Sequence, residues 1–314
     1  MIVACGGRSP AEAAVLLERA ARAVAPRRTL ESAQARTFTL SAAHQRMERE
    51  RMRAKVAGTA ALASALRTGL ADCRAAALQS FGLREAVTTA ELDRFDFDPR
   101  HLANAILPHV EGAYRSGAQS AHDELIGLRE GARKPKATAL ASVGVSFDAA
   151  PQAAIDALYQ RELVFATDVV AREKVGLKAV LLQSLQDGDG PEQTADRIRD
   201  YFADGIHLVD DDGDVTRTIP TDTWIDTVAK TEISNASATG TMTTYQQAGV
   251  EKIMWLTAED ERVCPECEPL DGVIVALGEN FPGTDCDTPG TLHPGDRCNM
   301  VSAGFVDDDQ DEAA

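Results

Sequence analysis

The chain has 314 residues, 44% of them hydrophobic and only 5% aromatic, and its formal net charge is −17 at pH 7. So acidic a surface repels nucleic acid at long range, which excludes a protein that binds DNA with most of its surface. Residues 1–60 are the exception, with 11 Lys and Arg against 5 Asp and Glu. Contact with DNA or an acidic partner is therefore expected only at the N-terminal helices, and a solvated helix face is the alternative.

The first half of the chain is rich in alanine, which favours helices. Residues 10–25 predict a short helix with Pro10 in its first turn. Residues 29–80 contain no proline and predict one long helix or two nearly continuous helices. Part of this stretch is polar on most sides, as expected of a helix that is exposed or awaits a partner. Residues 100–130 predict a further helix with a buried face formed by Ile106, Val110, Tyr114 and Leu125.

Glycines and prolines between residues 131 and 151 predict a linker. Residues 151–186 predict a second helical region, whose apolar side chains are Ile155, Leu158, Leu163, Val169, Val170, Leu177, Val180, Leu181 and Leu185. Pro191 then opens a helix, with Ala195, Ile198, Tyr201 and Phe202 facing inward. The acidic stretch 210–214 does not fit the spacing of an EF-hand, so a solvated loop is expected there.

The C-terminal third changes character from helix to strand. Thr221 or Asp222 can cap a helix that runs to about Gln247, and Gly249 ends it. Residues 252–256 and 273–275 are rich in β-branched or large apolar residues and predict two short strands. Residues 307–314 hold five acids and predict a disordered tail.

These elements predict a mainly α protein with a small C-terminal α+β module. The expected organisation is a helical N-terminal region at residues 1–135, a domain at 151–303 that contains a metal module at 251–303, and a tail at 304–314. No apolar run approaches the roughly 18 residues of a transmembrane helix, so no membrane partner is expected.

Four of the six cysteines lie within 35 residues of one another, at positions 264, 267, 286 and 298. Cys264 and Cys267 form a Cys-x2-Cys pair, and His293 and Cys298 follow after a predicted strand. This spacing predicts a tetrahedral zinc site with Cys264, Cys267, His293 and Cys298 as ligands. A set that is rich in thiolates and already full indicates a structural ion. The alternatives are a redox pair, which lacks a thioredoxin-like context here, and buried cysteines without an ion.

Cys286 lies between the two pairs and could replace Cys298 or His293 as a ligand. Four ligands already exist without it, so a loop thiol is expected.

A longer pattern surrounds these ligands, made of Lys230-Thr231-Glu232, Asn235, Tyr245, Gly249-Val250, Trp255, Thr257 to Cys267, Leu270-Asp271-Gly272, Leu292-His293-Pro294 and Arg297-Cys298. Over residues 222–303 this pattern resembles the Mu F-like head morphogenesis domain of tailed phages. The family usually reads His-Pro-x-Cys-Arg-Cys, and here Asp296 stands in place of the first of those two cysteines. Either Cys298 takes the ligand role, Asp296 coordinates through oxygen, or Cys286 compensates.

The resemblance implies a minor capsid protein of a tailed phage or prophage, which acts structurally in head assembly near the portal, with a role in DNA packaging or ejection. The implied partners are the portal protein, the major capsid or scaffold protein, and packaged DNA through the basic N-terminal helices. Such a protein is expected in the virion, and in the host cytoplasm before assembly, without a small-molecule substrate.

Two enzymatic alternatives are a capsid maturation protease and a zinc-finger nuclease associated with phage heads. The sequence has no nucleophile elbow and no recognisable catalytic constellation. A nuclease of the His-Asn-His type needs a catalytic histidine beside the finger, and His293, the histidine of this region, is already assigned to the metal.

Overall fold

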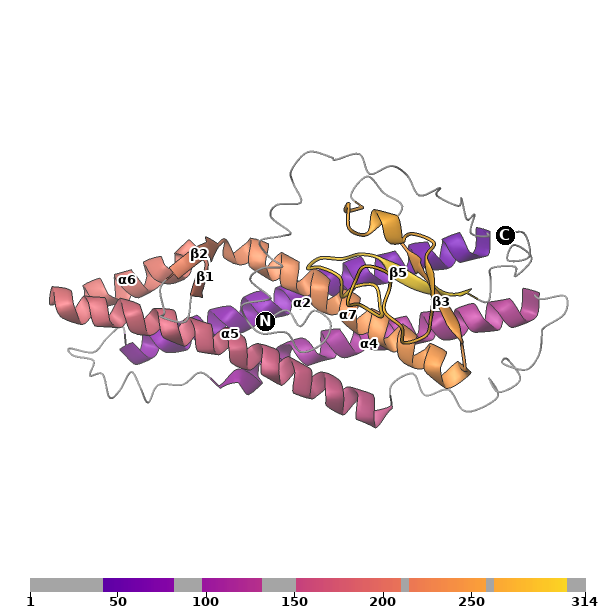
Figure 1. Ribbon diagram of the computed structural model, residues 1–314. Coiled ribbons are helices and arrows are strands. Elements are labelled where there is room, and N and C mark those ends of the chain that lie inside the picture. Colours follow the sequence, from indigo (N-terminus) through magenta and orange to yellow (C-terminus); the bar gives the residue numbers. More distant parts are fainter. Residues whose placement is uncertain (1–41, 82–97, 132–150, 210–214, 258–262, 304–314) are drawn as a thin grey trace. The chain divides into compact units, whose positions relative to one another are not determined.

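Five α-helices dominate the computed structural model, which describes residues 42–81, 98–131, 151–209, 215–257 and 263–303 (Figure 1). The predicted fold class, mainly α with a small C-terminal α+β module, is confirmed. The predicted helix at 10–25, the linker, the acidic loop and the acidic tail lie outside the described residues. The helices are α2 (Ala42–Phe81), α4 (Pro99–Gly131), α5 (Gln152–Asp187), α6 (Pro191–Asp204) and α7 (Thr221–Ala248).

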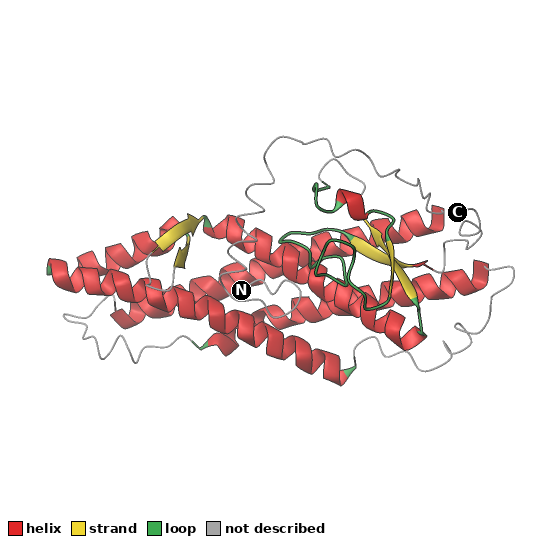
Figure 2. Ribbon diagram, viewed as in Figure 1, coloured by secondary structure: helices red, strands yellow, loops and turns green. Residues whose placement is uncertain are grey.

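The strands form two small antiparallel sheets (Figure 2). One is a hairpin of β1 (Ile206–Val209) and β2 (Val215–Ile219). The other has the order β4-β3-β5, with β3 (Lys252–Leu256) between β4 (Ile274–Ala276) and β5 (Asn299–Ser302). The first predicted C-terminal strand is confirmed and the second is shifted by one residue. The hairpin and β5 were not predicted, because four or five residues are too short for a clear alternation of polar and apolar side chains.

Apolar spacing explains most of the helix faces. Ile106, Val110, Tyr114 and Leu125 of α4 are all at most 2% exposed, as predicted. In α5 the predicted apolar face is buried at its centre, whereas Leu185 near the end is exposed. Helix α7 ends at Ala248, and Gly249 takes the positive φ of 70° that a helix-terminating glycine provides.

The chain divides into two compact units. Of the described residues, the first unit holds 60–81, 98–108, 156–209 and 215–229, and the second holds 42–59, 109–131, 151–155, 230–257 and 263–303. The predicted domain boundary at residues 131–151 falls mostly outside the described residues and stays a prediction.

The first unit is built on a helical core. Side chains of α2, α5 and α6 meet in one buried cluster, formed by Cys73, Ala77, Phe81, Val170, Leu177, Leu181, Ile198 and Phe202. Arg74 of α2 holds both carboxylate oxygens of Glu173 on α5, at 3.1 and 3.2 Å, and its guanidinium lies 5.0 Å from the Phe202 ring centroid. Bidentate pairs of this kind fix the relative placement of two helices.

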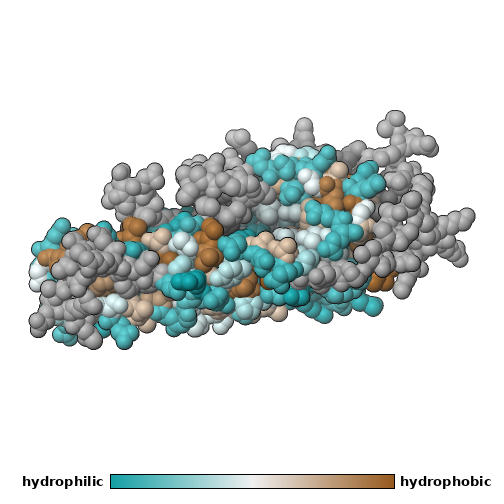
Figure 3. Space-filling model, turned by 90° about the horizontal axis from the view of Figure 1, so that it is seen from below, coloured by the Kyte–Doolittle hydropathy of each residue, from teal (hydrophilic) through white to brown (hydrophobic). Residues whose placement is uncertain are grey.

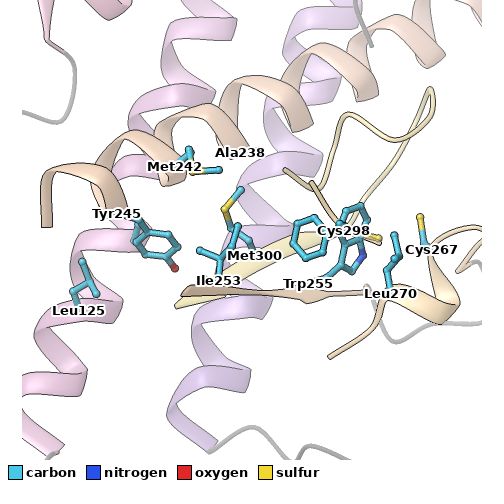
Figure 4. Packing of buried hydrophobic residues seen from close by; sticks show 12 residues of the cluster. Leu125, Ala238, Met242, Tyr245, Ile253, Trp255, Cys267, Leu270, Cys298 and Met300 are labelled. Atoms are coloured by element: carbon cyan, nitrogen blue, oxygen red, sulfur yellow. The ribbon is translucent and has the colours of Figure 1, made fainter. Parts of the chain in front are cut away.

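The second unit packs helices α4 and α7 against the three-stranded sheet (Figure 4). Its core cluster consists of Ala121, Leu125, Ala238, Met242, Tyr245, Ile253, Trp255, Cys267, Leu270, Phe281, Cys298 and Met300. The ring of Phe281 stands edge-on to Trp255, with 4.9 Å between centroids. Because two cysteines of the predicted metal site belong to this cluster, the site is built on the core of the second unit.

Two glycines let α4 and α7 touch backbone to backbone. A Cβ on Gly117 would lie 2.0 Å from the carbonyl oxygen of Ser237, and one on Gly240 would lie 2.1 Å from that of Tyr114. Thr241 donates its hydroxyl across the crossing to the carbonyl of Gly117, at 3.2 Å. No side chain larger than hydrogen fits at either position.

Polar and apolar residues alternate over the surface seen in Figure 3. The large apolar side chains that stay exposed are scattered over several elements, as is usual for folded chains: Val56, Ile126, Val164, Val175, Leu185, Val215 and Ile274. Within the described ranges, no helix combines the length and apolar character needed to cross a membrane.

Candidate metal centre

Two loops of the second unit bring the predicted ligands together. Cys264 and Cys267 lie in the turn that precedes a short 3-10 helix, η2 (Glu268–Leu270). In that turn the Cys267 amide donates to the Cys264 carbonyl and approaches the Cys264 sulfur, both at 3.1 Å. This tight knuckle directs both sulfurs to the same side, toward the loop that carries His293 into β5.

His293 faces both sulfurs. Its Nε2 lies 2.9 Å from Cys264 Sγ and 3.2 Å from Cys267 Sγ, and its Nδ1 lies 3.1 Å from the carbonyl oxygen of Pro294. When Nδ1 donates to that carbonyl, Nε2 of the neutral ring keeps a free lone pair. A histidine that binds metal usually donates its other N–H in this way, so the arrangement fits a ligand role.

Cys298 joins the cluster from the other side of Cys267. The ligand atoms of Cys264, Cys267 and His293 lie within 4.8 Å of one another, and so do those of Cys267, Asp296 and Cys298. The four predicted ligands thus form two overlapping groups that share Cys267, rather than one group. Figure 4 shows Cys267, Cys298, Leu270 and Trp255 gathered at one end of the apolar cluster.

The ligand atoms surround a cavity of about 30 Å³, lined by Val263, Cys264, Cys267, His293, Gly295, Asp296, Arg297 and Cys298. That volume suits a single small ion. Sulfur and imidazole nitrogen are the donors that zinc prefers, and two sulfurs bound to one zinc lie within about 4.6 Å of each other, twice the Zn–S distance. The residues present therefore fit a metal ion of the zinc type.

The two alternative ligands have different surroundings. Asp296 is 1% exposed; its Oδ1 accepts the Cys298 amide at 2.8 Å and its Oδ2 accepts the Gly290 amide at 2.9 Å. Cys286 is buried but belongs to neither group of ligand atoms. Its carbonyl accepts the Phe281 amide at 2.8 Å, which holds a separate turn.

Mutual contacts shift the pKa values of the cluster in opposite directions. The hydrogen bond from Cys267, and then the contact with His293, lower the pKa of Cys264 to about 4 despite burial. The same bond to Cys264, a bond to Cys298 and burial raise the pKa of Cys267. Burial lowers the pKa of His293, but the hydrogen bond with Cys264 and the charge of Asp296 outweigh it and raise that pKa to about 9. These contacts favour loss of the Cys264 proton, and a divalent cation would displace the remaining protons of the cluster.

Helix α7 supports the loop that carries His293. Thr231 accepts the Gly295 amide at its hydroxyl oxygen, at 2.9 Å. Gly290 has φ +93°, and a Cβ there would lie 3.2 Å from the backbone of Ser234. Of the neighbouring charged residues on α7, Lys230 is exposed and Glu232 is 3% exposed.

Helix α2 also contacts this loop, which sequence reasoning missed. Lys55 donates to the carbonyl of Cys298 at 3.0 Å, and Arg51 donates to that of Met300 at 3.2 Å. The two cations are 8% and 6% exposed, so this part of α2 is not the solvated basic face considered from sequence. The i, i+4 spacing of two cations in an alanine-rich helix was the available signal, but it does not distinguish a solvated face from a buried one.

A buried carboxylate explains how Arg51 is accommodated. Glu124 of α4 is 1% exposed and accepts from Arg51 Nη2 at 2.8 Å, from the Tyr245 hydroxyl at 2.7 Å and from the Ser302 amide at 2.8 Å. Burial lowers the pKa of Lys55 to about 8, although the charge of Asp296 opposes this shift. Both cations are therefore parts of the packing around β5.

This part of the chain combines a long helix with a small sheet and a Cys/His cluster that could hold a metal ion. Residues 176–301 match the family model described as Phage Mu protein F like protein. The match runs from α5 into β5 and includes every residue of the cluster, so the predicted resemblance to this family is confirmed over residues 176–301. No curated protein and no solved structure matches the chain significantly.

Proposed function

We propose that the protein is a head-morphogenesis protein of a tailed phage or prophage, a minor capsid component that acts structurally near the portal. The observation that carries this proposal is the family match over residues 176–301, which contains the complete Cys/His cluster. The same match supports a place in the virion. The portal protein is the expected partner, with the major capsid or scaffold protein as further candidates, and a role in DNA packaging or ejection follows from that position.

The metal cluster is assigned a structural role within this function. Zinc would be held by Cys264, Cys267, His293 and Cys298, and it would join the turn before η2 to the loop before β5. The contacts of His293 with two sulfurs and one backbone carbonyl favour a ligand role over that of a general base for nuclease or protease chemistry. Metal-dependent nicking of DNA that is lost in His293→Ala, with the fold retained, would favour the nuclease instead.

Within the described residues, we place the proposed contact with packaged DNA on one exposed face of α2. Arg46, Arg49 and Arg53 are exposed and spaced as on one helix face, whereas Arg51 and Lys55 are buried. Replacing the three exposed arginines with glutamine should reduce DNA binding and its salt dependence together, because each phosphate contact releases counterions. Unchanged binding would remove this face from the proposal.

The proposed function is tested by co-expression of the full chain with the portal protein of the same phage or prophage. We expect one complex on size-exclusion chromatography, and the protein in purified heads by mass spectrometry. A Cys264→Ser/His293→Ala variant should weaken incorporation because the module loses its ion, whereas Cys286→Ser is the matched control. Absence from heads together with no portal complex would contradict the assignment.

A further inference from the structure

Asp296, in the loop before β5, carries a deeply buried carboxylate. Each of its oxygens already accepts a backbone amide, Oδ1 that of Cys298 and Oδ2 that of Gly290. The bond from Oδ1 to the amide two residues later is the pattern of an Asx turn. Asp296 thus fixes the backbone at the point where Cys298 enters the cluster.

Cys298 is held from a second side by helix α2. Lys55 donates to the Cys298 carbonyl, and its ammonium interacts electrostatically with both Asp296 and Cys298. Three thiolates and Asp296 would place four negative charges around one divalent ion. The buried ammonium of Lys55 supplies positive charge beyond that of the ion, as a buried cluster of this composition requires.

We propose that Cys298 is the fourth metal ligand and that Asp296 and Lys55 are outer positioning residues, which present Cys298 to the ion without binding it. The inference rests on the proposed metal site and deepens it. Asp296 would organise the turn through its two amide bonds, and Lys55 would tie that turn to α2. Residues that orient ligands from outside the coordination sphere typically change metal affinity by about 10–100-fold.

The test uses the full chain loaded with Co²⁺, which takes zinc sites and reports its ligands by absorption. Thiolate-to-cobalt charge transfer grows with the number of thiolates, and the d–d bands report tetrahedral geometry. Cys298→Ser should lose about one third of the charge-transfer intensity, since three thiolates become two. Cys286→Ser, the matched control, should keep the full intensity.

The positioning residues should behave differently from a ligand. Asp296→Asn keeps one amide acceptor but cannot accept both amides, so it should retain the tetrahedral spectrum and bind Co²⁺ about 10–100-fold more weakly. Lys55→Met should change affinity in the same direction, whereas Lys230→Met at an exposed position of α7 should not. A spectrum in Asp296→Asn that has lost a ligand, with Cys298→Ser unaltered, would overturn the proposal and make Asp296 the ligand.

The possible outcomes distinguish an error in the identity of the fourth ligand from an error in the metal site itself. No Co²⁺ binding by the wild-type chain would overturn the metal site itself, whereas binding with an unaltered Cys298→Ser spectrum would overturn only the fourth ligand. Loss of intensity in Cys286→Ser would reassign that ligand to Cys286. If circular dichroism shows that Asp296→Asn does not fold, the paired cysteine variants still decide whether Cys298 coordinates.

Discussion

At the scale of single residues, the second unit depends on a carboxylate that no motif indicates. Glu124 accepts hydrogen bonds from a side chain of α2, a side chain of α7 and the backbone of β5. Its ion pair with Arg51 is almost inaccessible to solvent, with side chains 1% and 5% exposed. A buried pair of this kind adds little net stability over an apolar pair. Removal of one partner, however, leaves the other charge buried without a counter-charge.

Glu124→Ala is therefore expected to lower the free energy of unfolding by about 3–5 kcal/mol, because Arg51 stays buried without its counter-charge. Urea denaturation followed by circular dichroism measures the change. Asp123→Ala is the control on the same helix: Asp123 is exposed and accepts a hydrogen bond from Gln119 at the surface, so the change should stay within about 0.5 kcal/mol. Equal changes in the free energy of unfolding for the two variants would show that the buried hydrogen bonds of Glu124 do not stabilise the fold.

Glu162 of the first unit offers a prediction about pH. Its side chain is 0% exposed, neither oxygen accepts a hydrogen bond from the described part of the chain, and the Nε of Arg161 lies 3.9 Å away. Burial raises the pKa of Glu162 above its ordinary value of 4.5 despite the charge of Arg161, so the folded state holds this proton to higher pH than the unfolded state does. This contribution to stability is complete below pH 4.5 and is lost as pH rises through the folded pKa.

Glutamine cannot ionise, so Glu162→Gln should not lose stability when pH rises. The free energy of unfolding of the variant, relative to that of the wild type, should therefore increase as pH rises above about 4.5. Urea denaturation at a series of pH values measures the difference, with Glu50→Gln at an exposed position of α2 as control. A constant difference between Glu162→Gln and wild type across the series would contradict the burial of an ionisable carboxyl.

The candidate site was predictable from the donor atoms in the sequence. Cys264, Cys267 and His293 were predicted and lie together, because thiolates and imidazole at knuckle spacing have few other uses. The roles of Lys55, Arg51 and Glu124 were not predictable, since each depends on a contact more than 70 positions away along the chain. Asp296 was recognised as a departure from the family pattern, but only the two amide contacts show what its carboxylate does.

At the scale of elements, α4 and α7 cross in direct backbone contact within the second unit. Gly117 and Gly240 each lie against backbone atoms of the opposite helix, which cannot move aside as a flexible side chain would. Thr244 extends the crossing by donating to the carbonyl of Ala118 at 3.3 Å. The helices themselves were predicted well from apolar spacing and caps, but spacing does not reveal which glycines serve a crossing.

Gly240→Ala should therefore lower the free energy of unfolding by about 3 kcal/mol, because the new methyl group would overlap the Tyr114 carbonyl. Gly112→Ala is the control in α4: nothing lies within 4 Å of its Cβ, so the better helix propensity of alanine should raise stability by up to about 1 kcal/mol. Thermal unfolding followed by circular dichroism measures both. A neutral Gly240→Ala would mean that the helices cross less closely.

At the scale of the whole molecule, the compact units do not follow the order of the chain. The second unit combines residues of α2 and α4 with α7 and the metal module, so its parts come from three separate stretches. The predicted domain at residues 151–303 stays a prediction. Composition and turn signals mark linkers, but they do not show which distant helices share a core.

A fragment of residues 151–303 should consequently lack a stable second unit even with zinc, since it omits Ala121, Leu125 and Glu124 together with the contacts from α2. A chain of residues 42–303 should fold. Dispersion of amide signals in NMR spectra distinguishes the two. A well-dispersed spectrum of the shorter fragment would show that the metal module is sufficient for its own fold.

The position of Glu124 has a consequence for how such proteins diverge. The region that matches the family spans residues 176–301, yet the hydroxyl of Tyr245 within it and the amide of Ser302 directly after it both donate to Glu124, which is encoded upstream of the match. Recombination that joined this C-terminal region to an unrelated N-terminal half would leave Ser302 and Tyr245 without their hydrogen-bond acceptor. The reciprocal product would leave Glu124 buried without these two donors. The two halves of the gene should therefore be inherited together, and natural exchange points should lie outside residues 51–302.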